Sequence, residues 1–589
     1  MILNSLSFSE IWVVHFLTTL KDDGLPFPQY VVAKEVVSQK TIRLSGSELH
    51  EAKACPFSKN DKVLFVCYDS SSAMQCFVSL NWALPVNMVD LKVEFRRILS
   101  GHEGEHSFSL LEALEYFNLP HRYSVGPVEP CGTMHFQQSH GCFPSIYAKQ
   151  DCEGTADAIC LLYQKMKSEL HFPYCLIRGK YMQSVAFMEI QGIPIDTSLL
   201  NLLLDKWKWI CEKMIGQKDP NGVYNSGSFC EHNFENYLHE KQIPWPRHPS
   251  GKLRLDEETF RFKARAYPKY IARYYELRCA LNKLKLPNLA ISSDGRNRVN
   301  LGPFRSTTSR NQPSSIRFIF GPSTWTRGLI KPNKGTFIAY IDWCQQELGI
   351  AAALSGDKNM QDAYNSGDPY LTFAQMAHAV PATATKESHP TERAVYKICM
   401  LAVQYGMGPE SLAQELGKPV YEANQLLGAH KMAFPAYWEW NQRIMDTGFG
   451  EGRPETSFGW TRKIYPESKP ASVGNFPVQG NGAEMLRIAI GFMHEAGVKV
   501  CAPIHDAVLI EGEMNKEDEI LIIAQNCMQK ASEIVLGGFS LDTDVKVVRA
   551  PNRYMDEDRG KAFWNEIMTL IEQPLYQSSN PSTATTNHN

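Results

Sequence analysis

Residues 342–357 read DWCQQELGIAAALSGD, and residues 504–511 read IHDAVLIE. In each stretch an aspartate closely follows a run of apolar residues that favour β-strands: FIAYI before Asp342, and residues 498–504 before Asp506. If two such strands lie side by side, their carboxylates form a site for a pair of divalent metal ions. The pattern therefore predicts a two-metal centre built from two segments that are far apart in the chain.

A basic helix is expected between these two segments, where residues 393–406 read RAVYKICMLAVQYG. Arg393, Lys397, Leu401 and Tyr405 recur every four residues, so they share one face of a helix. Two cations and an aromatic ring that face a two-metal site indicate binding of a triphosphate and a base pair.

The composition bounds the class of protein. A chain of 589 residues is too long for one core, so three or four domains are expected. It is 43% hydrophobic and 21% charged, which is typical of a soluble protein, and no run of 18 apolar residues predicts a membrane helix. The start lacks a basic region, which argues against a signal peptide. The 15 cysteines show no disulfide-like spacing, so reduced thiols and a cytoplasmic protein are expected.

The net charge of −3 argues mildly against nucleic-acid binding, but the distribution of charge matters more. Residues 252–285 carry ten Lys/Arg against four Asp/Glu, interleaved with four tyrosines: Tyr267, Tyr270, Tyr274 and Tyr275. A solvated basic face is one interpretation. Beside a metal site, a helix that grips phosphates is the better one, because phosphate contacts need only positive charge in the right region.

The order of the motifs resembles the family A DNA polymerases, relatives of bacterial DNA polymerase I, and especially their shorter phage and prophage members. The resemblance runs over residues 300–570 and rests on DWCQQEL with LSGD, the helix R-x3-K-x7-YG, NFPVQGNGAEMLR, and the HD pair in a hairpin. It implies an α/β multidomain chain with a right-hand polymerase fold and, in front of it, a ribonuclease-H-like domain of the 3′-5′ exonuclease type. The expected domains are 1–170 exonuclease-like, 171–299 connector and helical thumb, 300–370 first part of the palm, 371–454 fingers, 455–572 second part of the palm, and 573–589 a disordered tail.

The resemblance also implies an activity, which is template-directed addition of deoxynucleotides to a primer 3′-hydroxyl with release of pyrophosphate. Asp342, Asp506 and the carbonyl of Trp343 would hold two Mg²⁺ ions, with Mn²⁺ as a substitute, because hard cations require oxygen ligands. Lys397 would be the general acid and Arg393 a triphosphate ligand.

Further residues follow from the same resemblance. Glu347 has the spacing of the residue that excludes a ribose 2′-hydroxyl, and Gln345 is its nucleotide-binding neighbour. Tyr405 would stack on the templating side. Leu401 stands where relatives have an aromatic residue, and Tyr370 where many have a histidine. Contacts to the primer-template are expected from Arg310, Asn475, Gln479 and His505, which would test base pairing through minor-groove acceptors.

The N-terminal domain is expected to have lost proofreading. Where relatives carry Asp-x-Glu in the first strand, this chain has His15 and Leu17, and Ala73 stands where a second acid is expected. Without the first pair, metals should bind poorly. The domain is then structural or guides DNA.

Three hypotheses remain open from the sequence. The first is a DNA polymerase that acts on primer-template DNA and deoxynucleoside triphosphates in a bacterial or phage-infected cytoplasm, with no membrane partner. The second is a single-subunit RNA polymerase of phage type, against which Glu347 argues. The third is a non-catalytic DNA-binding protein, against which Asp342, Asp506, Lys397 and Arg393 argue.

Overall fold

The structure is a computed structural model of the chain, and it describes residues 7–57, 60–120, 146–225, 227–282, 286–321 and 323–572. The chain divides into two compact units. The first joins residues 1–193, 292–313 and 334–549, and the second joins residues 194–291, 314–333 and 550–589. The predicted disordered tail, residues 573–589, lies outside the described residues.

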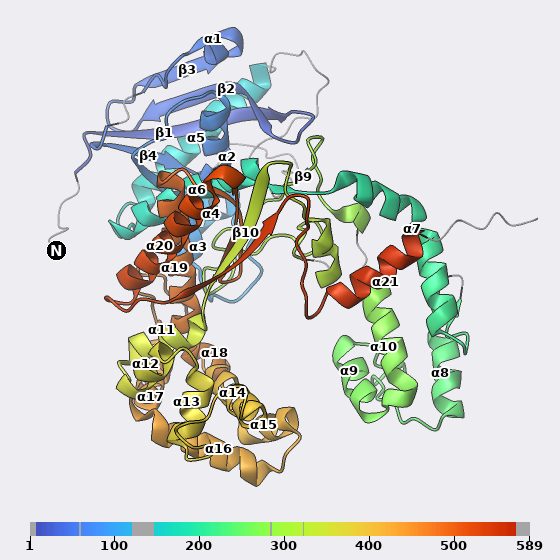
Figure 1. Cartoon of the computed structure of the whole chain (residues 1–589). Coiled ribbons are helices and arrows are strands. Elements are labelled where there is room, and N and C mark those ends of the chain that lie inside the picture. The colour runs from blue at the N-terminus through green and yellow to red at the C-terminus, as the bar shows by residue number, and fades with distance from the viewer. Residues whose placement is uncertain are drawn as a thin grey trace, which may run out of the picture. The chain divides into compact units, whose positions relative to one another are not determined.

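The first unit begins with a five-stranded sheet in the order β3-β2-β1-β4-β5 (Figure 1). β1 is parallel to β4, and β4 to β5, whereas β1–β2 and β2–β3 are antiparallel. Alternate residues of β1 enter separate cores, Trp12, Val14 and Phe16 on one face and Val13 and Leu17 on the other, so both faces of the sheet are covered. This part of the chain comprises β1 Glu10–Leu20, β2 Pro26–Glu35, β3 Thr41–Ser45, α1 Gly46–Glu51, β4 Val63–Cys67, α2 Ser70–Ser79, β5 Asn87–Asp90, α3 Leu91–Ile98, α4 Leu110–Tyr116, α5 Ile146–Met166 and α6 Tyr174–Gln191.

A second, antiparallel sheet lies in the same unit, with the order β11-β12-β10-β13. It joins strands from distant parts of the sequence, β10 Thr336–Trp343, β11 Lys499–Ile504, β12 Ala507–Glu513 and β13 Thr543–Arg549. The strands predicted before Asp342 and Asp506 are therefore confirmed as β10 and β11. Helices α19 Phe476–Glu495 and α20 Glu517–Val535 pack on this sheet and on each other, and α11 Gln346–Ser355 packs on α19. The short helix η3 Met514–Lys516 directly follows β12, and β9 Arg296–Asn297 pairs with β6 Ile193–Pro194 in a separate two-stranded sheet.

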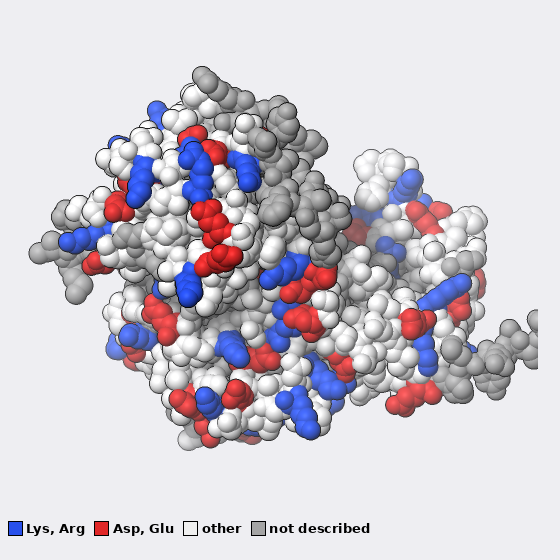
Figure 2. Space-filling view, turned by 90° about the horizontal axis from the view of Figure 1, so that it is seen from above, with Lys and Arg blue, Asp and Glu red and all other residues white. Residues whose placement is uncertain are grey.

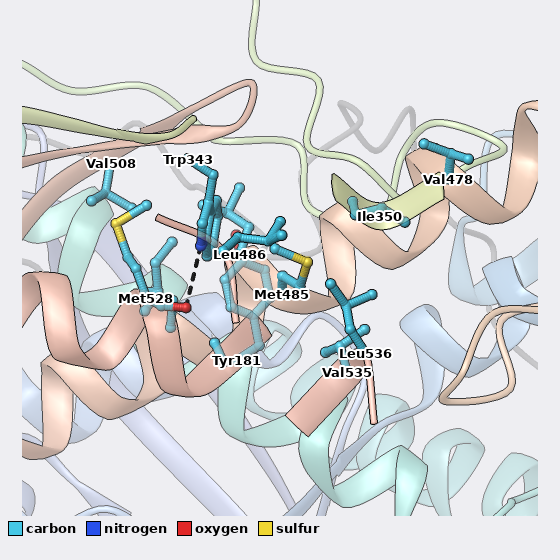
Figure 3. Packing of buried hydrophobic residues seen from close by; sticks show 14 of the residues in the cluster. Tyr181, Trp343, Ile350, Val478, Met485, Leu486, Val508, Met528, Val535 and Leu536 are labelled. Atoms are coloured by element: carbon cyan, nitrogen blue, oxygen red, sulfur yellow. Dashed lines mark hydrogen bonds between the residues drawn. The ribbon is translucent and has the colours of Figure 1, made fainter. Parts of the chain in front are cut away.

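The end of β10 is fixed by the core beneath it. The indole of Trp343 is buried, and its Nε1–H donates to the Met528 carbonyl oxygen at 3.2 Å (Figure 3). The neighbouring Cys344 N–H donates to the Asp542 carbonyl oxygen at 2.8 Å. These contacts hold the backbone that carries Asp342.

The remaining helices of the unit are α12 Lys358–Asn365, α13 Pro369–Met376, α14 Pro390–Gln404, α15 Pro409–Leu416, α16 Val420–Ala433, α17 Pro435–Glu451 and α18 Pro470–Gly474. The basic helix predicted over residues 393–406 is confirmed as α14. It buries Tyr396, Cys399, Met400 and Val403 and leaves the face of Lys397 outward, as a 3.6-residue period requires.

Two local predictions need correction. The sequence NGAEMLRIAIGFMHEAG, residues 481–497, predicts an amphipathic helix, but α19 is buried nearly all round because it lies between α6, α11 and α20. The sequence SFGWTRKIYP, residues 457–466, predicts a strand and a turn; the described residues include a turn there but no strand, only an isolated bridge between Glu455 and Thr461.

The second unit is mainly helical. It contains α7 Thr197–Lys218, β7 Tyr224–Asn225, β8 Ser228–Phe229, α8 Glu231–Glu240, α9 Glu257–Ala266, α10 Pro268–Asn282, η1 Leu286–Asn288, η2 Thr324–Leu329 and α21 Lys561–Glu572, while β6 Ile193–Pro194 lies at its boundary. Of the tyrosines in the basic stretch, Tyr274 is fully buried against Phe234 rather than displayed on a surface. In the part of the chain that the structure describes, every helix falls short of the length and apolar character needed to cross a bilayer.

Candidate active site

The two aspartates come together at one edge of the second sheet. Asp342, near the end of β10, is paired in register with Ala507 on β12 and with Asp544 on β13. Asp506 immediately precedes Ala507, in the turn that joins β11 and β12. Residues opposite one another in an antiparallel pair have Cα atoms about 4.5–5.5 Å apart, so Asp544 lies directly beside Asp342 on one side, and Asp506 adjoins the residue that faces Asp342 on the other.

The electrostatics agree with this placement. Desolvation, together with the negative charges of Asp506 and Asp544, raises the pKa of Asp342 to about 6. Three carboxylates within interacting range make the ionised state of Asp342 costly, and a divalent cation would relieve that cost. Asp544 was missed by sequence reasoning because only the strand register places it beside Asp342.

The donor set suits magnesium that is shared with a substrate. Among the described residues, no group of three or more His, Cys, Asp or Glu side chains is arranged to hold a metal by itself. Mg²⁺ is commonly bound through one or two carboxylates and the phosphates of a substrate. Asp342 and Asp506 fit that mode, and they do not form a closed all-protein site.

A second cluster adjoins the aspartates at the start of α11. Arg310 Nη2 lies 3.6 Å from Glu347 Oε1. Desolvation, the nearby Glu347 carboxylate and, more weakly, Asp506 raise the pKa of the Tyr405 hydroxyl. Gln345 precedes the helix with a φ of 40°, in the left-handed region. The structure thus brings the predicted residues Arg310, Glu347 and Tyr405 to the side of Asp506.

The cations of α14 gather around Tyr370 on α13. The Arg393 guanidinium lies 5.4 Å and the Lys397 ammonium 5.6 Å from the centre of the Tyr370 ring. Arg393 Nε also donates to Asp368 Oδ2 at 2.6 Å, whereas no described residue forms an ion pair with Lys397. Leu401, on the same face, is half-buried. No hydrogen bond or ion pair among the described residues joins this group to Asp342.

The predicted primer-template residues occupy two places. Asn475 caps α19, and its Oδ1 is buried without a hydrogen-bond partner, while Gln479 is partly exposed in the first turns of that helix. His505 is exposed in the β11–β12 turn with a φ of 57°, which is uncommon for a residue other than glycine.

A buried ion pair supports Arg310, and sequence reasoning missed it. Arg487 donates to the Ser309 carbonyl oxygen at 2.9 Å and to Ser309 Oγ at 3.0 Å, and it pairs with Glu484 at 2.9 Å. Ser309 is fully buried with a φ of 60° and directly precedes Arg310. Glu484 and Arg487 are three residues apart in the predicted helix, and this spacing indicates an ion pair. The sequence does not show that the pair holds Ser309, because that contact is tertiary.

The solved structure titled "POL domain of Pol1 from M. smegmatis complex with DNA primer-template and dNTP" shares the fold, with a TM-score of 0.70 and 18% identity over 92% of this chain and 96% of that one. The family model for DNA polymerase family A matches residues 313–552 of this chain.

The chain is also similar to curated DNA polymerases. Thermostable DNA polymerase I of Thermus thermophilus is 29% identical over 211 residues, which is 33% of this chain and 25% of that one. DNA polymerase I of Aquifex aeolicus is 25% identical over 389 residues, which is 62% of this chain and 65% of that one. The DNA polymerase of Mycobacterium phage D29 is 24% identical over 378 residues, which is 62% of this chain and 61% of that one. The match thus spans about a quarter of the Thermus enzyme and less than two thirds of the other two.

Proposed function

We propose that this chain is a template-directed DNA polymerase that adds deoxynucleotides to a primer 3′-hydroxyl and releases pyrophosphate. The observation that carries the proposal is the meeting of Asp342 and Asp506 beside Arg310, Glu347 and Tyr405, in a chain whose residues 313–552 match the model of DNA polymerase family A. The substrates are primer-template DNA and deoxynucleoside triphosphates.

Asp342, Asp506 and the Trp343 carbonyl would hold two Mg²⁺ ions, for which Mn²⁺ can substitute. When bound, the ions lower the pKa of the primer hydroxyl and neutralise charge on the leaving oxygens. Arg393 can hold the triphosphate in a bidentate manner, and Lys397, which has no competing carboxylate among the described residues, can donate a proton to the leaving pyrophosphate.

The remaining side chains select the substrate. Glu347, fixed by Arg310 and Tyr405, would crowd a ribose 2′-hydroxyl, with Gln345 beside it and Leu401 and Tyr370 bordering the nucleotide. Arg310, Asn475, Gln479 and His505 would contact the minor groove at the primer end, where the acceptors are shared by all correct pairs.

The proposed domains follow the right-hand scheme. Residues 300–370 and 455–572 are the palm, 371–454 the fingers, and 171–299 the connector and thumb. The mixed sheet within residues 1–170 suits a ribonuclease-H-like domain.

In that N-terminal domain, the absence of an acidic pair in β1 supports loss of proofreading. Leu17 is buried, and desolvation lowers the pKa of His15 to about 4, so that His15 is neutral at physiological pH. Asp69 and Asp90, the nearby acids, are engaged, because Asp69 pairs with Lys92 at 2.7 Å and Asp90 accepts from the Ser70 hydroxyl at 2.6 Å.

Primer extension with Mg²⁺ and either deoxy- or ribonucleotides tests the proposal. Extension with deoxynucleotides is expected for the wild type and for Asp362→Asn, a matched control at an exposed aspartate of α12. Asp342→Asn and Asp506→Asn should each abolish it. Preferential use of ribonucleotides would instead support an RNA polymerase, and no extension by the wild type would support a binding protein. Removal of a mismatched 3′ end without nucleotides would refute the loss of proofreading.

A further inference from the structure

An irregular hairpin formed by residues 452–464 carries two facing cations. The Arg462 N–H donates to the Pro454 carbonyl oxygen at 3.2 Å, and the Ile464 N–H donates to the Gly452 carbonyl oxygen at 2.8 Å. These bonds bracket Arg453 and Lys463, which therefore lie opposite each other. Like charges in opposed positions are destabilising. In the part of the chain that the structure describes, no carboxylate forms an ion pair with either of them.

A loop of the N-terminal domain brings a third ionisable group to this hairpin. The Lys463 N–H donates to the Ser100 carbonyl oxygen at 2.9 Å. A Cβ on Gly101, which has a φ of +78°, would lie 2.5 Å from the Lys463 carbonyl oxygen, so the two backbones touch. His102 follows, with its Nε2 buried and unpaired. Desolvation lowers the pKa of His102, and the positive charges of Lys463 and Arg453, with a smaller effect of His106, lower it further.

A third segment, residues 305–310, contacts the same loop and hairpin. The Thr307 carbonyl oxygen accepts hydrogen bonds from Ser100 Oγ at 3.2 Å and from Trp460 Nε1 at 3.1 Å. Arg305, two residues earlier, is exposed and has no ion-pair partner among the described residues. Arg305 lies five residues before Arg310, which belongs to the candidate active site, so these cations start close to that site in the chain.

We propose that Arg305, Arg453 and Lys463, together with His102, bind the phosphate backbone of the DNA strand that extends away from the Asp342–Asp506 site. We call these four residues the seam cluster. This proposal rests on the proposed polymerase function. Three segments converge to hold uncompensated positive charge, and phosphates supply the missing counter-charge without any reading of base sequence.

Charge elsewhere on the surface is arranged differently. On the face seen in Figure 2, Lys and Arg are interspersed with Asp and Glu. Many exposed cations of the chain are paired, for example Arg247 with Glu235 and Arg549 with Glu517. Among the acids near the seam cluster in sequence whose side chains the structure describes, Glu103, Glu105 and Glu455 are exposed, and no ion pair within the described residues joins them to it. The seam cluster therefore differs from an ordinary solvated surface, because no described carboxylate forms an ion pair with its positive charges.

The test is the salt dependence of DNA binding by the full chain. Fluorescence anisotropy with a labelled primer-template, between about 0.05 and 0.2 M salt, would compare the wild type with the triple variant Arg305→Gln, Arg453→Gln and Lys463→Gln. A matched triple, Lys40→Gln, Lys53→Gln and Lys62→Gln, removes the same charge from exposed lysines of the N-terminal domain. The seam triple should bind about tenfold or more weakly, with the slope of log K against log salt reduced by about 2–3. The control slope should stay unchanged.

The outcomes separate the two proposals. Equal slopes for the seam triple and the matched triple would overturn the seam cluster, whether or not the protein extends primers. Failure of the wild type to extend a primer would overturn the polymerase proposal, while the slopes would still decide on the cluster. If the triple variant does not fold, Arg305→Gln alone, in an exposed position, should reduce the slope by about 0.7–0.9.

Discussion

Replacing Asp342 by asparagine should stabilise the metal-free protein while it abolishes catalysis. The pKa of Asp342 is raised from 3.8 to about 6 by desolvation and by the charges of Asp506 and Asp544. The folded protein therefore binds the Asp342 proton more tightly than the unfolded chain does. The cost of ionisation is fully present above about pH 6, decreases as the pH falls through that value, and is gone below the unfolded pKa of 3.8.

The size of this effect follows from the raised pKa. A difference of roughly 2 pKa units corresponds to about 3 kcal/mol, at ~1.4 kcal/mol per unit. Asp342 is only half-buried, so solvent screening reduces the expected gain to about 1–2 kcal/mol. Asparagine keeps the shape of the side chain and removes the charge, so Asp342→Asn should recover most of that amount in the absence of metal.

Thermal unfolding in the presence of a chelator would measure this gain in stability. At pH 8, the melting temperature of Asp342→Asn should exceed that of the wild type by about 2–4 °C, and at pH 4 the difference should vanish. Mg²⁺ should raise the melting temperature of the wild type at pH 8 and have little effect on the variant. The control Asp362→Asn, on the exposed side of α12, should match the wild type throughout. A variant that is less stable than the wild type at both pH values would refute the reasoning, because it would mean that the Asp342 carboxylate is stabilising in the folded state.

Three further predictions concern the surroundings of the site. Arg487→Met leaves the Glu484 charge buried without its partner and should lower the free energy of unfolding by about 3–5 kcal/mol in urea titrations; adding Glu484→Gln should restore most of it. Gly101→Ala forces a Cβ to 2.5 Å from a backbone oxygen at a φ of +78°, and should lower thermal stability by at least about 1–2 kcal/mol; unchanged unfolding would contradict the backbone contact. Glu347→Ala should lower discrimination against ribonucleotides, measured as a ratio of kcat/KM values, by about tenfold or more; an unchanged ratio would remove Glu347 from sugar selection.

Local patterns in the sequence were sufficient for the elements that carry the site. The apolar runs before Asp342 and Asp506 predicted β10 and β11, and the four-residue spacing of Arg393 and Lys397 predicted α14. Each of these elements can be predicted because its pattern lies within a few consecutive residues: a continuous apolar run for a buried strand, and a four-residue repeat for one face of a helix.

Other features depend on partners that the local sequence does not contain. Asp544 joins the aspartates because β13 pairs with β10 in one register, and a shift by one residue would point its side chain to the opposite face. Helix α19 has polar positions that suggested an exposed face, but Glu484 and Arg487 neutralise each other inside the core. The second compact unit is assembled from three separate segments of the chain, which no local pattern can indicate.

The contacts divide the candidate site into a part held by the second sheet and the core, and a part carried by α13 and α14. Asp342 lies on a strand bonded on both sides, and Arg310 follows Ser309, which is fastened by Arg487 in the core. Arg393 is instead tied to Asp368 on the neighbouring helix α13. A shift of α14 toward the aspartates therefore leaves Asp342 and Arg310 in place and must either carry α13 along or break the bond to Asp368. If Arg393 binds the triphosphate as proposed, the nucleotide would compete with Asp368 for the same guanidinium, and this pair would link nucleotide binding to one of the contacts between α13 and α14.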